Sequence, residues 1–196
     1  MSALEAEVYR DSDPTLLVPV DVGKDRIFFL SQLLEPPPDP MQIAVSTLTM
    51  STFVAWIYSA GLEDIIQDGV ALTGLIPTNA AFERLGVFAS FLLDAKNRYF
   101  LSDVLKFHFL PRAVYSPDIA KKQEAYPTLQ GETLDLIHSK RGNLSAIARG
   151  FSAHFLQRDL LTANGLLHEI DRLLLPDNLE VTLVSTHRLD VTVSSG

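Results

Sequence analysis

The chain has 196 residues, of which 24 are acidic and 16 are basic, and its formal net charge is −8. Apolar residues make up 47% of it, which is enough to build a core and excludes wholesale disorder. The negative charge is repelled by phosphate backbones, so we expect neither a nucleic-acid partner nor binding to anionic membranes. The chain has no cysteine, which excludes disulfides, thiol nucleophiles and cysteine-type zinc sites.

No segment has the pattern of a membrane anchor or a secretory leader. The first 14 residues are acidic and lack an apolar stretch, so they do not read as a signal peptide. No apolar run approaches the ~18 residues of a transmembrane helix, and we expect no direct membrane insertion. The chain is therefore expected to be either cytosolic or a piece of a longer protein.

Four prolines within residues 36–40 predict an extended linker or a domain edge. The chain then has three expected parts: an N-terminal extension or inter-domain linker (1–40), a main domain (41–178), and a C-terminal strand or linker (179–196). The extension is too short to fold alone. It either docks on the main domain or is the tail of a preceding domain. Its apolar runs at 16–18 and 27–34 favour docking, because they would otherwise form an exposed apolar patch.

The main domain opens with helical spacing. Apolar residues at helical intervals predict a helix over residues 53–60. Ser51 or Thr52 can cap its start, and Gly61 can end it in the left-handed conformation. One further short turn is expected at residues 62–66.

A buried strand and a second short helix are expected next. Residues 70–76 form an apolar run that Pro77 stops, which predicts the strand. Thr78 or Asn79 then caps a short helix that Gly86 closes.

A long helix is predicted over residues 88–109, ended by Pro111. The residues that share its apolar face are Leu101, Val104, Leu105 and His108.

Beyond Pro111 the pattern changes to strands and turns. Short β-prone segments alternate with turn residues at 114–115, 128–129 and 133–137. After a turn at Asn164 and Gly165, an apolar run predicts a strand over 166–175. Residues 179–193 alternate loosely and form a last strand or a linker. Helices first and strands later predict an α+β fold rather than alternating βαβ units.

Several blocks of residues, in matching order, resemble the fasciclin-like (FAS1) domain family. Residues 73–82, TGLIPTNAAF, resemble its first box, and residues 164–176, NGLLHEIDRLLLP, resemble its second. Between them, residues 105–108, LKFH, resemble the central Tyr-His element, and residues 128–131, TLQG, the T-L-x-G turn. Order and spacing fit over roughly residues 41–178.

The resemblance implies the FAS1 fold, a wedge-shaped β-sandwich with several α-helices packed at one side. It also implies an interaction module of adhesion proteins, often present in tandem, rather than an enzyme. Two positions depart from the family pattern. Ile76 stands where a small residue is usual, and Phe107 replaces the usual tyrosine, which removes a phenolic hydroxyl.

The resemblance carries over two candidate partner-binding sites. Asp159 and Leu160 stand where some animal relatives have an Asp-Ile pair implicated in integrin binding, so Asp159 could offer its carboxylate to a receptor-bound cation. The alternative is that Asp159 caps a turn and Leu160 belongs to the core. Phe107 and His108 match the Tyr-His element, also implicated in adhesion; the alternative is a buried histidine with a satisfied hydrogen bond.

The remaining family-motif residues are expected to be structural: Pro77, Thr78, Asn79, Phe82, Asn164, Gly165, His168 and Asp171. Thr78 and Asn79 are interpreted as helix caps and loop tethers. His168 and Asp171 are interpreted as hydrogen-bond partners of neighbouring backbone. Asn143 begins an N-x-S sequon and is a candidate glycosylation site if the protein enters the secretory pathway.

Enzymatic motifs fail one by one. No histidine follows His168–Glu169 at the spacing of a zinc-protease helix, and Ser152 near His154 lacks the second glycine of a nucleophile elbow. We expect no catalytic residue, cofactor or metal.

We therefore predict a non-enzymatic module that binds proteins or glycans at a cell surface, in the matrix or in an organelle lumen. It would be one domain, possibly among tandem copies, of a longer secreted or membrane-anchored protein. The alternative is a structural spacer, or a luminal segment of an organelle membrane protein with a role in trafficking.

Overall fold

The computed structural model describes residues 20–27, 29, 35–121, 124–139, 142–148, 150–177, 179–184 and 188–193. The chain divides into two compact units, Met1–Pro36 and Pro37–Gly196, and each is considered by itself. In the first, β1 (Val20–Val22) and β2 (Asp25–Ile27) form an antiparallel hairpin. The apolar runs predicted to dock lie outside the described residues, apart from Ile27 and Phe29.

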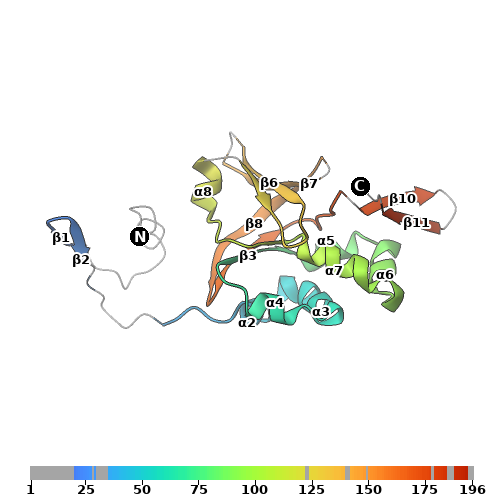
Figure 1. Cartoon of the computed structure of the whole chain (residues 1–196), viewed down its shortest axis with the longest axis horizontal. Coiled ribbons are helices and arrows are strands. Elements are labelled where there is room, and N and C mark those ends of the chain that lie inside the picture. Colours follow the sequence, from blue (N-terminus) through green and yellow to red (C-terminus); the bar gives the residue numbers. More distant parts are fainter. Residues whose placement is uncertain are drawn as a thin grey trace. The chain divides into compact units, whose positions relative to one another are not determined.

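Short helices make up the first part of the second unit (Figure 1). They are α2 (Pro40–Ser46), η1 (Leu48–Met50), α3 (Ser51–Ala60), α4 (Glu63–Gln67), α5 (Asn79–Glu83), α6 (Val87–Leu93), η2 (Ala95–Asn97) and α7 (Arg98–Lys106). None of the described helices is by itself long and apolar enough to cross a membrane. Only α2 taken together with η1 and α3 satisfies the length and composition, and that pair is bent by 100°.

A seven-stranded sheet forms most of the rest, in the order β4-β3-β9-β8-β7-β6-β5. Its strands are β3 (Leu72–Pro77), β4 (Phe109–Leu110), β5 (Glu124–Pro127), β6 (Thr133–His138), β7 (Leu144–Ala148), β8 (Phe151–Thr162) and β9 (Gly165–Ile170). The pair β3–β9 is parallel, and the other pairs are antiparallel. Strand β8 is long enough to pair with β7 over its first residues and with β9 over its last.

Two hydrophobic cores flank the central strands. One joins the helices to β3 and β9 and includes Met50, Ile57, Leu92 and Val104, all fully buried. The other collects residues from β3 to β9 and from α8 (Ser116–Lys121), such as Ile119 and Leu134. In Figure 1, α2 to α4 lie on one side of β3, whereas α8 and β6 lie on the other. Each large apolar side chain buried in these cores contributes about 1.5–3 kcal/mol.

The predicted helix and strand before Pro77 are present. The helix is α3, and Gly61 ends it with φ of 67°, as only a residue tolerant of the left-handed region can. The turn expected at 62–66 is α4. The strand predicted over 70–76 is β3, and all of its residues are buried.

The long helix predicted over residues 88–109 is wrong. Helix α6 ends at Leu93, Asp94 is extended with ψ of 131°, and α7 begins only at Arg98. The Asp94 carboxylate accepts a hydrogen bond from the backbone N–H of Lys96 at 2.9 Å. Aspartate readily makes such local bonds in place of helical ones, which breaks the helix here.

Four further predictions after Pro111 need correction. Residues 128–129 are not a strand but lie in the turn between β5 and β6. Residues 114–115 are not a strand but lead into α8, which periodicity did not predict. Strand β9 ends at Ile170, although the apolar run continues to residue 175. Residues 179–193 are neither a single strand nor a plain linker, since β10 (Leu179–Val184) and β11 (Arg188–Val193) form an antiparallel hairpin.

Asn79 fixes the start of α3 from a distant segment. Its Oδ1 accepts the N–H of Thr52 at 2.9 Å, and its Nδ2 donates to the carbonyl oxygen of Leu48 at 2.8 Å. The prediction that Ser51 or Thr52 caps this helix is wrong, because the N-cap is Met50, whose side chain makes no capping hydrogen bond. The amide of Asn79 supplies the acceptor that the first turn of every helix needs.

Replacing Asn79 with alanine should lower the free energy of unfolding by about 2 kcal/mol, because it removes the acceptor of the Thr52 N–H and the shorter of two hydrogen bonds to the Leu48 carbonyl. Asn143→Ala is the matched control, since Asn143 is exposed and its side chain makes no hydrogen bond with described residues. Urea unfolding measures the stability of both variants, and we expect the m-value to stay unchanged. Equal losses in the two variants would contradict the tethering role.

Candidate interaction site

Strand β8 carries a bulge at the first candidate site. The register with β9 shifts between Phe155 and Gln157 and again between Gln157 and Leu160. Within this bulge Asp159 has φ of 54°, one of two positive φ values at non-glycine residues among the described positions. The left-handed region costs an L-residue about 1–2 kcal/mol, so surrounding contacts must hold Asp159 there.

Those contacts come from α8 and β9. Oδ1 of Asp159 accepts the backbone N–H of Ser116 at 2.8 Å, and Oδ2 accepts the Ser116 hydroxyl. The backbone N–H of Asp159 donates to Nδ1 of His168 at 3.1 Å. The carboxylate therefore binds the start of α8, which favours the capping interpretation over an unoccupied ligand for a cation.

His168 connects this bulge to the segment that precedes α8. Its Nε2 lies 2.9 Å from the carbonyl oxygen of Val114. Because the N–H of Asp159 can only donate, Nδ1 of His168 must accept, and Nε2 must carry the proton. Burial lowers the pKa of His168, against the opposing effects of the Val114 carbonyl and the Asp159 charge. A neutral, fully buried ring thus holds the back of the bulge.

The bulge presents a short run of exposed side chains. Leu156, Gln157 and Arg158 are exposed, with 57% of Leu156 accessible. Leu160 is half-buried and packs against the helix-side core. Arg158 reaches the carbonyl oxygen of Gly142 at 3.5 Å, at the edge of hydrogen-bonding distance. Leu156 offers an apolar side chain beside the cation of Arg158 and the amide of Gln157. Because the backbone that carries them is fixed, this group can contact a protein surface.

Replacing Asp159 tests the strain directly. Both Asp159→Ala and Asp159→Gly remove the carboxylate, but only glycine accommodates positive φ at no steric cost. We expect the alanine variant to be less stable than the glycine variant by about 1 kcal/mol or more. Denaturant unfolding of the two proteins measures the difference. Equal stability would mean that the backbone at this position relaxes out of the left-handed region.

The second candidate site, Phe107 and His108, is enclosed. Phe107 belongs to the core formed by β3 to β9, where a tyrosine hydroxyl would need a partner. Nδ1 of His108 lies 2.7 Å from the Val104 carbonyl oxygen, and Nε2 accepts the N–H of Leu174 at 3.0 Å. Burial lowers the pKa of His108 to about 4, partly opposed by its bond to the Val104 carbonyl. This enclosure favours the structural interpretation.

The residues of the first box join β3 to the helices. Pro77 ends β3 and pairs with Ile170 of β9. The hydroxyl of Thr78 accepts the N–H of Ala81 at 3.3 Å and so caps α5. The ring of Phe82 lies 4.5 Å from that of Trp56 in an edge-on arrangement.

The residues of the second box fix β9 against its neighbours. Nδ2 of Asn164 donates to the carbonyl oxygens of Ile66 and Gln67 at 2.7 and 3.1 Å. The prediction that Gly165 lies in the turn is wrong, because Gly165 is the first residue of β9. Asp171 accepts the N–H of His154 at 2.7 Å. All three therefore bind backbone or lie against it.

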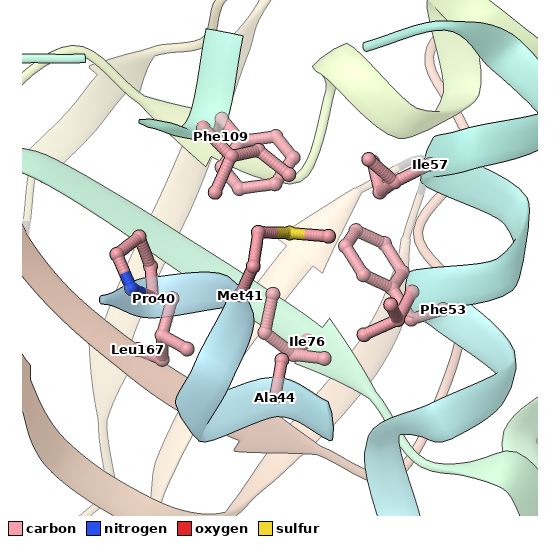
Figure 2. A pocket seen from close by; sticks show the side chains of 10 residues that line it. Pro40, Met41, Ala44, Phe53, Ile57, Ile76, Phe109 and Leu167 are labelled. Carbon is pink, nitrogen blue, oxygen red and sulfur yellow. The ribbon is translucent and has the colours of Figure 1, made fainter. Parts of the chain in front are cut away.

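Residues outside the sequence predictions add a serine–histidine contact and a small cavity. The hydroxyl of Ser145, the third residue of the sequon, lies 2.8 Å from Nδ1 of His154. Only the pairing of β7 with β8 brings them together, so no local pattern shows it. The cavity, of about 10 Å³, lies between α2, α3 and β3 (Figure 2). Met41, Phe53 and Phe109 line it, and it is an apolar packing gap of the core.

No metal cluster occurs within the described ranges, since no group of three His, Asp or Glu side chains lies close enough to hold an ion. Asn143, the candidate glycosylation site, is exposed in the turn between β6 and β7.

Comparisons with known proteins agree on one family. The model of the Fasciclin domain matches residues 48–176. Fasciclin-like arabinogalactan protein 15 of Arabidopsis thaliana is 33% identical over 56% of this chain, which spans about a quarter (24%) of that relative. Protein sll1483 of Synechocystis is 29% identical over 69% of this chain and 72% of its own length. Transforming growth factor-beta-induced protein ig-h3 of Sus scrofa is 29% identical over 76% of this chain and 21% of its own.

A solved structure gives the same fold. A FAS1 domain pair from the insect cell adhesion molecule Fasciclin I superposes with a TM-score of 0.63, covering 87% of this chain and 75% of that one, at 13% identity. At this identity the likeness concerns the fold alone, and it agrees with the α+β architecture of helices beside a mixed sheet.

Proposed function

Because the chain belongs to the Fasciclin domain family, we propose that it acts as a non-enzymatic adhesion or interaction module. Its partners are proteins or glycans at a cell surface, in the matrix or in an organelle lumen. It is one domain of a longer secreted or membrane-anchored protein, in which tandem copies would raise a modest affinity per domain. The match of both family boxes to structural positions supports this assignment.

The bulge on β8 is the observation that carries the proposed contact surface. Bulges re-aim side chains and recur next to functional sites, and a strained non-glycine residue is a reason to look for function. Here the strain at Asp159 fixes the backbone that presents Leu156, Arg158 and Leu160. These three side chains form the contact, and Asp159 positions them. Direct binding of a cation by Asp159 would require its carboxylate to leave Ser116.

An adhesion assay on the whole chain tests this surface. Leu156→Ala and Arg158→Ala together should reduce attachment of cells or matrix components at least about tenfold, as loss of central interface residues does. The matched control is Leu48→Ala with Arg172→Ala, because both of these residues are exposed and lie outside β8. Equal attachment by both variants would place the contact elsewhere on the domain.

Compartment is tested separately from contact. Protease protection of the native protein in its own cells, with a glycosidase mobility shift aimed at Asn143, distinguishes a luminal or extracellular location from a cytosolic one. Protection or surface exposure together with a glycan would support the proposal. Free cleavage in the cytosol without a glycan would overturn the location and leave the fold assignment intact.

A further inference from the structure

Helices α6 and α7 carry a row of aromatic rings that runs from the core to the surface. Phe88 is buried and stacks on Phe91 at 6.0 Å between ring centroids, with an interplanar angle of 9°. Phe91 lies 5.9 Å from Phe100, and Phe100 lies 6.0 Å from Tyr99. Tyr99 is 68% exposed. The core therefore supports an aromatic ring that faces solvent.

The surroundings of Tyr99 are apolar and basic. Leu93 and Val87 on α6 are also exposed, at 46% and 69%. Lys96 and Arg98 precede Tyr99, are exposed, and form no salt bridge with the described residues. Arg98 is held by its Nε, 3.3 Å from the Ala60 carbonyl oxygen. Residues 84–106 contain four basic and two acidic side chains, whereas acidic residues outnumber basic ones, 24 to 16, in the whole chain.

We propose that this α6–α7 surface, centred on Tyr99 and Lys96, is a second interaction surface and that it binds a protein segment with acidic and apolar side chains. Aromatic and arginine residues supported by a packed core are typical of the centres of protein interfaces. Charge complementarity selects the partner, because an acidic segment is attracted to Lys96 and Arg98 and repelled by the otherwise acidic chain. The surface uses none of the β8 residues.

A protein segment fits this surface better than a glycan does. The exposed ring of Tyr99 and the partly buried rings beneath it are not coplanar, since Phe91 and Phe100 are tilted by 39° and Tyr99 and Phe100 by 71°. They offer no single flat platform for sugar rings. The aliphatic side chains of Val87 and Leu93 add apolar area of the kind that leucine or phenylalanine of a partner buries.

Selection from a library of short random peptides on the immobilised whole chain tests the proposal. We expect the selected peptides to be enriched in Asp and Glu beside Leu or Phe. Their affinity should fall at least about tenfold in Tyr99→Ala and in Lys96→Glu, and it should weaken as salt rises. Tyr58→Ala is the matched control, because Tyr58 is 54% exposed on α3, and it should bind as the unaltered chain does.

Lys96→Glu keeps the test decisive if Tyr99→Ala loses stability, because Lys96 is exposed and its hydrogen bond to Asp94 uses the backbone N–H, which the substitution keeps. Selected peptides without acidic enrichment, or with equal affinity for Lys96→Glu, would overturn the proposal. Titration with an oligogalacturonate is the second arm. If the oligogalacturonate binds at Tyr99 and no selected peptide does, the partner is an acidic glycan and the protein assignment is wrong.

Discussion

Replacing Gly165 with alanine should abolish the folded state of the main domain. A Cβ built on Gly165 would lie 1.9 Å from the carbonyl oxygen of Leu72 and 2.7 Å from its nitrogen. These are backbone atoms of β3, which pairs in parallel with β9 at this position. No rotamer change can relieve such a contact, so the two strands must separate and expose both cores. We expect a loss on the order of 4 kcal/mol or more, measured as loss of the cooperative thermal transition.

Alanine substitutions at two other glycines should have smaller effects and serve as comparisons. Gly150→Ala meets nothing within 4 Å but has φ of 75°, so it should cost about 1 kcal/mol from backbone strain alone. Gly74→Ala would place its Cβ 2.8 Å from a side-chain carbon of Leu167 and 3.1 Å from one of Phe109. Those side chains can shift, at about 1–3 kcal/mol. If Gly165→Ala is as stable as Gly150→Ala, that result would contradict the close approach of β9 to β3.

Gly165 also shows where reasoning from sequence succeeds for a wrong reason. The Asn-Gly pair indicates a turn followed by a strand, and β8 does join β9 there through a turn. The glycine, however, is required by contact with Leu72, a residue 93 positions away in the chain. Local patterns report turn chemistry, whereas the approach of two strands is a property of the assembled sheet.

The same distinction separates the predictable elements from the rest. Helix α3 and strand β3 follow from spacing and punctuation, because their signals lie within the segment. The break at Asp94 depends on a single side chain competing with helical hydrogen bonds. The start of α3 depends on Asn79, and no pattern within residues 48–60 could show that. Helix α8 follows from no apolar period of its own and is instead bound at its start by Asp159.

The residues of the candidate site could be named from the sequence, but the contacts that join them could not. Resemblance to the family indicates Asp159 as a candidate binding residue and, separately, His168 as a structural residue. The structure places them in one network, because the N–H of Asp159 bonds to the ring of His168 and its carboxylate to Ser116. The positive φ of Asp159 has no decisive sequence signal, since aspartate enters the left-handed region more readily than most residues but is still usually found outside it.

Acidification should destabilise the domain through two buried histidines with opposite tautomers. In His108, Nδ1 donates to the Val104 carbonyl, and Nε2 accepts the N–H of Leu174. In His168, Nε2 donates to the Val114 carbonyl, and Nδ1 accepts the N–H of Asp159. A second proton on either ring faces a backbone N–H donor, so protonation breaks one hydrogen bond and places a charge in the core.

The direction of the effect follows from the lowered pKa of His108. The unfolded chain binds a proton on this ring below pH 6.5, whereas the folded chain resists until about pH 4. The contribution of His108 is therefore complete above pH 6.5 and is lost as the pH falls toward 4. At about 1.4 kcal/mol per pH unit, the loss is about 3 kcal/mol. The lowered pKa of His168 acts in the same direction.

Urea unfolding from neutral pH down to about pH 4 should show this decline, and His108→Gln should flatten it by about 3 kcal/mol. The carboxylates titrate in both proteins. Subtracting the unfolding free energy of the variant from that of the unaltered chain at each pH therefore cancels their contribution. Nitrogen-15 spectra of the imidazole rings provide the second measurement, independent of whether that variant folds. They should show a neutral ring protonated at Nδ1 in His108 and at Nε2 in His168. A charged His108 at pH 6, or an unchanged slope in His108→Gln, would contradict the burial argument. Either result would mean that water reaches the His108 ring near Leu174, so that Phe107 and His108 are open to solvent and could again contact a partner.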